Sequence, residues 1–348
     1  MLIDMDYFYV ACEELRHPEI KDKPAVVGMD PKGGKGRGVV MTCNYLAREF
    51  GIHSGMPISM AYKAKSDAIF LPVDFEYYED VSKKIMGLIK PYGTKFEQVS
   101  VDEAFLDVTG KASDYTDAQI LAKRIHDGIL SEIGIKCSIG IGPNKLISKM
   151  ACEKAKPNGI KLVKEEEVKE FISAMDVDSL YGIGGKTGEK LRKMGYATVA
   201  QLAKANEMKL IDEFGMFGHE MIMFANGFDD REVTENYDIK SIGREFTFEE
   251  NTNDGKEVDK AIEKLSSEVM KEVSKNQMSF KTVTLKLRYG DFTEHIHSRS
   301  IRLTNDIAAL IDTSKDLYRH SVDGTRKVRK IGVRVSNFTS YKGQRKII

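Results

Sequence analysis

Segments with the hydrophobic pattern of strands alternate with segments that have the pattern of helices along the first half of the chain. Short apolar runs predict strands, whereas apolar residues spaced three and four apart predict helices. Met1–Val10 is expected to be a short strand that runs into a turn or a helix start. The other expected strands are Ala25–Met29, Gly38–Thr42, Phe96–Val101, Ala104–Val108, Cys137–Ile141 and Ile160–Val163. The expected helices are about Asn44–Phe50, Ile58–Ala64, Phe75–Pro91, Asp117–Ile133 and Asn144–Glu153. This alternation predicts an α/β unit of about 165 residues.

The last third of the chain follows a different order of elements. The polar stretch Arg231–Lys240 lacks periodicity and is expected to be a linker. After it we expect strand Ser241–Phe248, helix Lys256–Ser274, strands Lys281–Arg288 and Glu294–Leu303, helix Asp306–Arg319 and strand Val328–Val335. This βαββαβ order suits a small sheet backed by two helices, so the fold class is a multidomain α/β protein.

A glycine-rich stretch between these two parts resembles a helix-hairpin-helix. Leu180–Gly195 places Gly182, Gly184 and Lys186 between two short helical segments. Glycines there would let a phosphate approach backbone N–H groups at the start of the second helix. A looser copy follows at Phe214–Gly218. A plain helical turn with a glycine cap is the alternative, and it has more weight for the second copy.

Composition narrows the class of protein. The chain has 348 residues, of which 41% are hydrophobic, so it can fill real cores. No apolar run approaches the roughly 18 residues of a membrane span, and no secretory signal opens the chain. The four cysteines are scattered, which argues against a disulfide framework and a structural metal. We therefore expect an intracellular protein without a membrane segment.

The balanced charge hides a basic C-terminal part. The whole chain has 53 Lys+Arg and 53 Asp+Glu, yet the stretch from Lys240 onward has 22 basic and 15 acidic residues. This asymmetry indicates a polyanion-binding module, with solvated helix faces as the alternative. Basic residues alternate along the predicted strands and are expected to share one side of the sheet. The candidate DNA contacts are Arg244, Lys281, Arg288, Arg299 and Arg334, with Lys286 and Arg302 in the same pattern.

Three carboxylates lie at the ends or turns of predicted strands. Asp4 ends the first strand, and Asp102 and Glu103 occupy the turn between two later strands. A central sheet would bring these ends to one face, where three carboxylates would bind hard cations such as Mg²⁺. A pair of such ions can promote an in-line phosphoryl displacement. On spacing alone, ordinary solvated turns remain the competing interpretation.

A second group of residues could hold a triphosphate. Thr42, Tyr45 and Arg48 recur three apart and are expected to share one face at the beginning of a helix. Their hydroxyl, phenol and guanidinium groups can all donate hydrogen bonds to phosphate oxygens. Lys156, held in a rigid Lys-Pro-Asn-Gly turn, is a further candidate cation. Taken one at a time, each of these is equally well explained as a surface residue.

Six motifs in order carry a resemblance to a known family. They are Asp4–Tyr9, Thr42–Arg48, Ser100–Ala104, Ser138–Lys145, Ala155–Gly159 and Ser241–Glu245. Together they resemble the Y family of DNA polymerases, the lesion-bypass class, and within it the DinB (polymerase IV and kappa) branch in its archaeal form. The resemblance runs essentially from end to end.

The resemblance implies a right-hand polymerase. Its expected parts are a palm (1–10 and 75–165), fingers (11–74), a helix-hairpin-helix thumb (166–230), a linker (231–240), a little finger (241–341) and a tail (342–348). Asp4, Asp102 and Glu103, with the Met5 carbonyl, would be the catalytic residues that hold two Mg²⁺ ions, for which Mn²⁺ can substitute. Tyr45, Arg48, Lys156, Thr42 and the backbone near Phe8 would bind the dNTP. Tyr9 would be the steric gate against ribonucleotides, although its pattern alone predicts a core residue.

The implied activity is template-directed transfer of nucleotides from a dNTP to a primer 3′-hydroxyl, with low fidelity. Primer-template DNA and dNTP are the expected partners, and the cytoplasm, at the nucleoid, is the expected location. A sliding clamp is a further candidate partner, because Gln344–Ile348 resembles the opening of a clamp-binding peptide without its two aromatics. The short start before Asp4 suggests a short first strand or a trimmed end. A non-catalytic DNA-binding repair scaffold, a nucleotide cyclase and a two-metal nuclease are the rival functions.

Overall fold

The computed structural model describes residues 1–235, 238–322 and 324–340. Contacts divide the chain into two compact units, Met1–Asn236 and Tyr237–Ile348. Each unit is described by itself. Among the described residues, no helix is long and apolar enough to cross a membrane.

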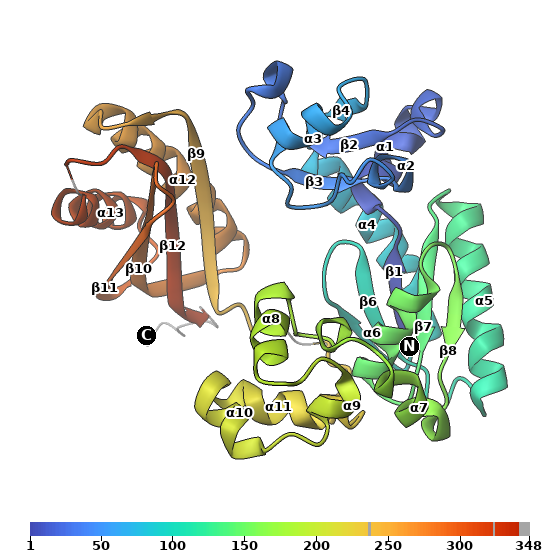
Figure 1. The fold of residues 1–348 in the computed structure, drawn as a ribbon. Coiled ribbons are helices and arrows are strands. Elements are labelled where there is room, and N and C mark those ends of the chain that lie inside the picture. Colours follow the sequence, from blue (N-terminus) through green and yellow to red (C-terminus); the bar gives the residue numbers. More distant parts are fainter. Residues whose placement is uncertain (236–237, 323, 341–348) are drawn as a thin grey trace, which may run out of the picture. The chain divides into compact units, whose positions relative to one another are not determined.

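The first unit contains a five-stranded sheet with the order β5-β6-β1-β7-β8 (Figure 1). Its strands are β1 (Leu2–Met5), β5 (Lys95–Gln98), β6 (Glu103–Asp107), β7 (Cys137–Ile141) and β8 (Ile160–Leu162). The central strand β1 is buried along its whole length and is antiparallel to both β6 and β7. Because successive side chains of a strand alternate between faces, Ile3 and Met5 face one side of the sheet while Leu2 and Asp4 face the other.

Helices cover the two faces of this sheet. Ile3 and Met5 belong to the core formed with α4 (Phe75–Ile89) and α5 (Tyr115–Glu132). On the opposite face, Leu2 packs with Cys152 of α6 (Lys145–Ala155). Asp4 therefore lies on the α6 side of the sheet.

A second, three-stranded sheet with the order β3-β2-β4 lies in the segment predicted as fingers. Its elements are β2 (Ala25–Gly28), β3 (Val40–Cys43), β4 (Ile69–Leu71), α1 (Phe8–Arg16), α2 (Tyr45–Arg48) and α3 (Ile58–Ala64). The helix α2 is only one turn long, shorter than predicted. Asn44 caps it through Oδ1, which accepts hydrogen bonds from the backbone N–H of Ala47 and of Ala25 at 3.1 Å each. The same side chain thus joins the helix start to strand β2.

Short helices form the segment predicted as the thumb. They are α7 (Val168–Ser173), α8 (Gly185–Lys193), α9 (Val199–Leu202), α10 (Glu207–Phe214) and α11 (Met216–Ala225). The first helix of the predicted hairpin is only a 3₁₀ turn, Val177–Ser179. Gly182 has a φ of +86°, which explains the need for glycine in this turn. The second glycine-containing helix pair, α10 and α11, also forms, and a Cβ on Gly218 would lie 2.3 Å from the carbonyl oxygen of Leu210.

The stretch predicted as a linker is attached to the palm strands over its first half. Lys95 Nζ lies 2.6 Å from a carboxylate oxygen of Glu232. The backbone N–H of Thr234 donates to Glu97 Oε2 at 3.1 Å, and Glu97 also binds Lys145 Nζ at 2.6 Å. Residues 231–235 are therefore docked on the first unit. Of the remaining linker residues, the structure describes 238–240 only.

The second unit is a four-stranded antiparallel sheet with the order β11-β10-β12-β9. Its elements are β9 (Ser241–Thr252), α12 (Gly255–Lys275), β10 (Met278–Tyr289), β11 (Glu294–Thr304), α13 (Ile307–Ser321) and β12 (Val328–Ser340). Both helices pack on one face through a core that includes Val283, Leu285, Val333 and Val335. The βαββαβ order is confirmed, and within residues 238–322 and 324–340 no helix covers the other face of the sheet. We call this face the open face.

Candidate active site and nucleic-acid interface

The structure brings two of the predicted metal ligands into direct register. Asp4 on β1 is the antiparallel partner of Glu103 on β6. Asp102 lies in the turn just before β6, and its carbonyl accepts a hydrogen bond from the Met5 N–H at 2.9 Å. Its carboxylate is turned toward Ser100, whose Oγ lies 2.5 Å from Oδ1. Within the described ranges, no three His, Cys, Asp or Glu side chains are gathered closely enough to hold a metal ion.

Two lysines from α6 and its C-terminal end lie between these carboxylates. Lys156 Nζ is 3.0 Å from Asp4 Oδ2, and Lys149 Nζ is 2.6 Å from Glu103 Oε2 and 3.8 Å from Asp4 Oδ2. Burial raises the pKa of Asp4 to about 6, against the opposing effect of Lys156. Burial alone would lower the pKa of Lys156, but pairing with Asp4 and Glu153 raises it. Lys149 is a site residue that sequence reasoning missed.

This arrangement fits hard divalent cations. Carboxylate oxygens from neighbouring strands are the ligands that Mg²⁺ prefers, and they are already compensated here by positive charge. The ammonium groups of Lys149 and Lys156 provide this charge. Without it, burying the carboxylates would cost folding free energy. Asp4, Glu103 and Asp102 are therefore chemically suited to bind such cations, although their oxygens do not converge on one point in the structure.

The predicted triphosphate ligands come from three different elements. Tyr45 and Arg48 lie on α2, with the Arg48 guanidinium 4.7 Å from the centre of the Tyr45 ring. Thr42 lies on strand β3, so the expectation that it shares a helical face with them is wrong. Lys156 directly follows α6, beside the Asp4 carboxylate.

Asp6 links these ligands and was also missed by sequence reasoning. It is 1% exposed and accepts hydrogen bonds from Ser138 Oγ at 3.0 Å and from the backbone N–H of Asn158 at 2.7 Å. The hydroxyl of Tyr45 donates at 3.3 Å to Asp6 Oδ1, the same oxygen that accepts from Ser138, whereas Asn158 donates to Oδ2. One buried carboxylate thus fixes both Tyr45 and the turn that carries Lys156.

The start of α1 lies directly after these acidic residues. Tyr7 has a left-handed backbone conformation (φ 38°, ψ 47°), and no side chain caps the helix. The N–H groups of a first helical turn favour an anion. The side chain of Phe8 is in the core, so only its backbone can serve a nucleotide, whereas Tyr9 is half-buried.

Comparisons with known proteins identify the family. A family model described as "impB/mucB/samB family" matches residues 3–153, its C-terminal domain model matches 239–347, and a helix-hairpin-helix model of the same family matches 165–196. A protein named DNA polymerase IV 2 from Methanosarcina mazei is 41% identical over 96% of this chain and 90% of its own length. The chain belongs to the Y family of DNA polymerases, in its DinB (polymerase IV) branch.

Other relatives of this polymerase agree along the whole chain. DNA polymerase IV from Streptococcus gordonii is 36% identical over 97% of this chain and 95% of its own length. The solved structure of a Y-family chimera, Dbh-Dpo4(243-245)-Dbh, has a TM-score of 0.90 at 31% identity, covering 97% of this chain and 98% of the other. An insertion ternary complex of Dbh DNA polymerase has a TM-score of 0.68 at 30% identity with the same coverage.

The thumb of the polymerase presents the predicted phosphate-binding turn. Gly184 is the N-cap residue of α8, and no side chain caps the backbone N–H groups at the start of this helix. Lys186 lies in the first turn of α8 and is exposed. The three predicted residues Gly182, Gly184 and Lys186 therefore lie together at one helix N-terminus, as a backbone phosphate site requires.

The little-finger sheet divides the predicted DNA contacts between its faces. Strand pairing places Arg288 opposite Lys330 and Thr284 opposite Arg334, all on the open face. Arg299 is the partner of the core residue Val283 and forms an ion pair with Asp316 of α13, so it faces the helices. Arg302 lies in the stretch of β11 between the pairs Thr282–Ser300 and Phe280–Thr304, where the register shifts, so the regular alternation expected to join it to Arg299 is interrupted there.

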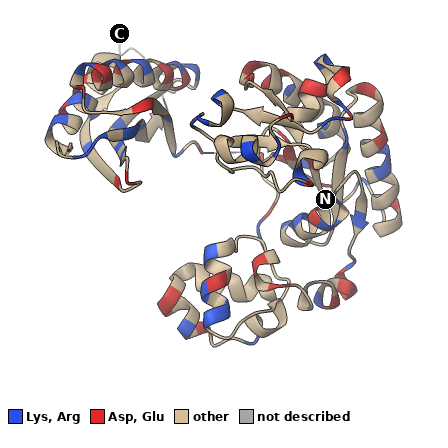
Figure 2. Cartoon of the chain, turned by 45° about the horizontal axis from the view of Figure 1, so that its top comes forward, with Lys and Arg blue, Asp and Glu red and all other residues tan. Residues whose placement is uncertain are grey.

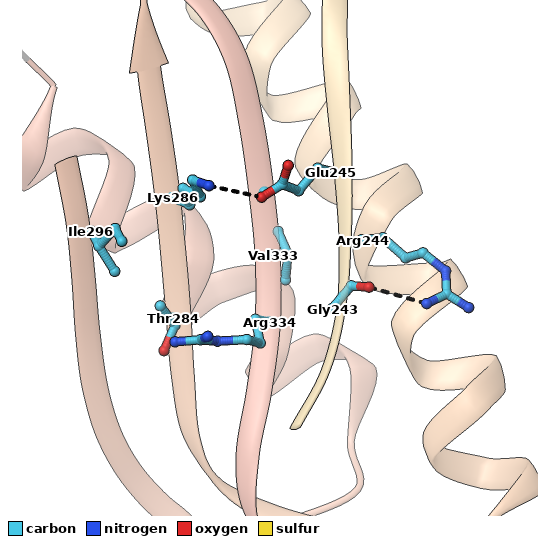
Figure 3. Close-up of a pocket in the computed structure, with 9 residues that line it drawn as sticks. Gly243, Arg244, Glu245, Thr284, Lys286, Ile296, Val333 and Arg334 are labelled. Carbon is cyan, nitrogen blue, oxygen red and sulfur yellow. Dashed lines mark hydrogen bonds and ion pairs between the residues drawn. The ribbon is translucent and has the colours of Figure 1, made fainter. Parts of the chain in front are cut away.

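Two further predicted contacts lie elsewhere. Arg244 is opposite the core residue Val333, and Figure 3 shows its side chain turned toward the helix, away from the open face. Lys281 lies where the β10–β11 register shifts between Phe280 and Thr282. Lys281 and Lys286 are also five residues apart, an odd spacing, so simple alternation along the strand does not join Lys281 to the row of Lys286 and Arg288.

The open face carries both signs of charge. Lys286 Nζ lies 3.2 Å from Glu245, an ion pair drawn in Figure 3. It also lies 3.1 Å from Glu294. Lys330 also pairs with Glu245, and Arg288 with Glu294. Blue and red segments accordingly mix along the strands of this unit in Figure 2. Gly332 lies opposite Glu245 and leaves a hollow that Arg334 and Thr284 also line.

Proposed function

We propose that this polymerase carries out template-directed DNA synthesis of low fidelity and copies damaged templates, as its membership of the family indicates. A primer 3′-hydroxyl attacks the α-phosphate of a bound dNTP, one P–O bond forms, the bond to the β-phosphate bridge breaks, and pyrophosphate leaves. Positioning and charge stabilisation supply the catalysis of such a transfer. Polymerases of this family depend on divalent metal ions.

We assign the metal site to Asp4, Asp102, Glu103 and the Met5 carbonyl, with two Mg²⁺ ions as the proposed complement. When bound, such ions activate the attacking hydroxyl and stabilise the leaving oxygen. The observation that carries this assignment is the register of Asp4 with Glu103, compensated by Lys149 and Lys156.

The nucleotide is assigned to the surface next to these carboxylates. Tyr45, Arg48, Thr42 and Lys156, together with the backbone at Phe8, would bind the triphosphate by charge-assisted hydrogen bonds. Tyr9 would lie against the sugar and exclude a 2′-hydroxyl by repulsion. Support comes from the shared hydrogen-bond network around Asp6, which fixes Tyr45 and the Lys156 turn to one group.

Primer-template DNA is the proposed macromolecular partner. The insertion ternary complex of Dbh DNA polymerase is similar in structure to this chain. In this chain, the thumb turn and the open face would supply the groups that bind DNA phosphates. We place the enzyme with its DNA in the cytoplasm, at the nucleoid. A sliding clamp is proposed as a second partner through Gln344–Ile348, which lies outside the described residues together with the rest of the tail.

The test is extension of a primed template with Mg²⁺ and all four dNTPs. Asp102→Ala and Glu103→Ala should abolish extension while primed-DNA binding stays within a few-fold, because DNA affinity comes mainly from the thumb and little finger. Asp127→Ala, which removes an exposed carboxylate from α5, is the matched control and should extend normally. Degradation of the primer would favour the nuclease, and binding without extension by the parental chain would favour the scaffold. Near-parental extension by Asp102→Ala would refute the metal assignment.

A further inference from the structure

The ring of Tyr9 is backed by a second aromatic ring. Tyr9 stacks on Tyr78 of α4 with 4.7 Å between ring centroids and 23° between ring planes. Phe75, one turn earlier on α4, meets Tyr9 edge-on at 6.1 Å. Tyr78 is only 1% exposed. Tyr9 therefore has no room to move toward α4 unless Tyr78 is displaced.

Tyr78 is itself held by a buried carboxylate. Its hydroxyl donates to Glu13 Oε1 at 2.7 Å, and Glu13 is 3% exposed. Burial raises the pKa of the Tyr78 phenol, which keeps the hydroxyl protonated and able to donate. Tyr9 and Glu13 are four residues apart on α1, so both lie on the same face of that helix. Helix α1 thus carries Tyr9 at its beginning and, one turn later, Glu13, which binds the hydroxyl of Tyr78.

Arg16 completes the connection between α1 and α4. Its Nη2 lies 2.6 Å from Glu13 Oε1 and its Nη1 lies 2.8 Å from Asp74 Oδ2. Asp74 is the N-cap residue of α4 and accepts a hydrogen bond from the backbone N–H of Tyr77 at 3.2 Å. A buried carboxylate with both a guanidinium and a phenol as partners is well compensated. The first turn of α4 is therefore fixed to α1 where Tyr78 meets Tyr9.

We propose that Tyr78, held by Glu13 and Arg16, is a positioning residue that fixes the Tyr9 ring and thereby sets discrimination against ribonucleotides. This inference rests on the role proposed above for Tyr9. Exclusion by repulsion depends on the rigidity of the group that repels, because a ring that can retreat gives way to the extra hydroxyl. The ring and hydroxyl of Tyr78 contact Tyr9, Tyr77 and Glu13, so its effect on the reaction would pass through the Tyr9 ring.

The test is single-nucleotide insertion kinetics on the full chain with a dNTP and the matching ribonucleotide. The measured quantity is the ratio of the two kcat/KM values. Tyr78→Ala should lower this ratio by between about twofold and tenfold, the range that the strength of one aromatic pair allows, mainly through faster ribonucleotide insertion. Tyr78→Phe retains the stacked ring and should restore most of the parental ratio. If Tyr78→Ala does not fold, Tyr78→Met fills the volume with a flexible chain and should show the same direction.

Tyr62→Ala is the matched control. It removes a tyrosine ring from α3, where that ring lies 5.8 Å from the ring of Phe70, and should leave the sugar ratio unchanged. In a Tyr9→Ala background, adding Tyr78→Ala should produce no further change in the ratio, because the group it positions is gone. An equal loss of discrimination in Tyr62→Ala would show a general structural effect and would overturn the inference.

The role of Tyr9 as the gate and the role of Tyr78 as its support can be refuted separately. If Tyr9→Ala keeps the parental sugar preference, the assignment of Tyr9 as the gate is refuted. If Tyr9→Ala loses discrimination by orders of magnitude while Tyr78→Ala and Tyr78→Met retain the parental ratio, only the positioning role of Tyr78 is refuted.

Discussion

The open face of the little finger makes a quantitative prediction about salt. Lys330 and Arg334 lie four residues apart along β12, an even spacing, so both point to the open face. Each phosphate that a cation neutralises on B-DNA adds about 0.9 to the slope of log affinity against log salt. Replacing both residues, in Lys330→Gln/Arg334→Gln, should lower the slope by up to about 1.8. Between about 50 and 200 mM salt, the parental chain should then lose about 12-fold more affinity than the variant.

The value is an upper one because Glu245 already compensates part of the Lys330 charge. The matched control is Arg299→Gln/Arg319→Gln, which also removes two positive charges from the same unit. Those residues pair with Asp316 and Asp259 on the helical face and should not contact the duplex. Fluorescence anisotropy of a labelled primer-template, measured at several salt concentrations, gives the slopes. If both double variants lower the slope equally, net charge determines binding and the assignment of the open face is wrong.

Two more predictions concern the buried acids. Because the pKa of Asp4 is raised from 3.8 to about 6, its carboxyl stabilises the metal-free fold below its ordinary pKa, and this stability is lost as pH rises through about 6. Chemical denaturation in the presence of a chelator should show a loss of up to about 3 kcal/mol across that window, and Asp4→Asn should remove it. Asp6→Asn replaces one carboxylate oxygen with an NH₂ group, which cannot accept the hydrogen bond that Asn158 N–H donates to Asp6 Oδ2. The KM for dNTP should therefore rise while the affinity for primed DNA stays the same. An unchanged KM would contradict the linking role of Asp6.

Much of the fold could be predicted because local patterns and tertiary structure agree. The βαββαβ order of the second unit follows from alternating and helical periods alone, and the carboxylates at strand ends meet because β1 and β6 are neighbours in the sheet. Thr42 was misplaced because a spacing of three suggests a helix, whereas α2 begins only after the cap at Asn44. Helix length here depends on the hydrogen bonds of Asn44 to two backbone segments, which a local pattern does not contain.

The faces of the little-finger sheet were harder to predict for a physical reason. A strand alternates strictly unless a bulge intervenes, and the register shift between Phe280 and Thr282 belongs to the pairing of β10 with β11, which a local pattern does not contain. Asp6, Glu13 and Lys149 were missed because a polar residue inside an apolar pattern gains a role only from partners distant in sequence.

Lys149 and Lys156 allow the carboxylates of Asp4 and Glu103 to lie side by side in the metal-free protein. Asp4 and Glu103 are adjacent in register and largely removed from water, so two negative charges there would repel each other strongly. Lys149 and Lys156 supply an equal positive charge from a single helix and its C-terminal turn. Since α6 packs on the same face of the sheet to which Asp4 points, the packing that buries Leu2 against Cys152 also delivers this charge. The packing of α6 thus fixes the neighbouring carboxylates of Asp4 and Glu103 together with the two cations that compensate them.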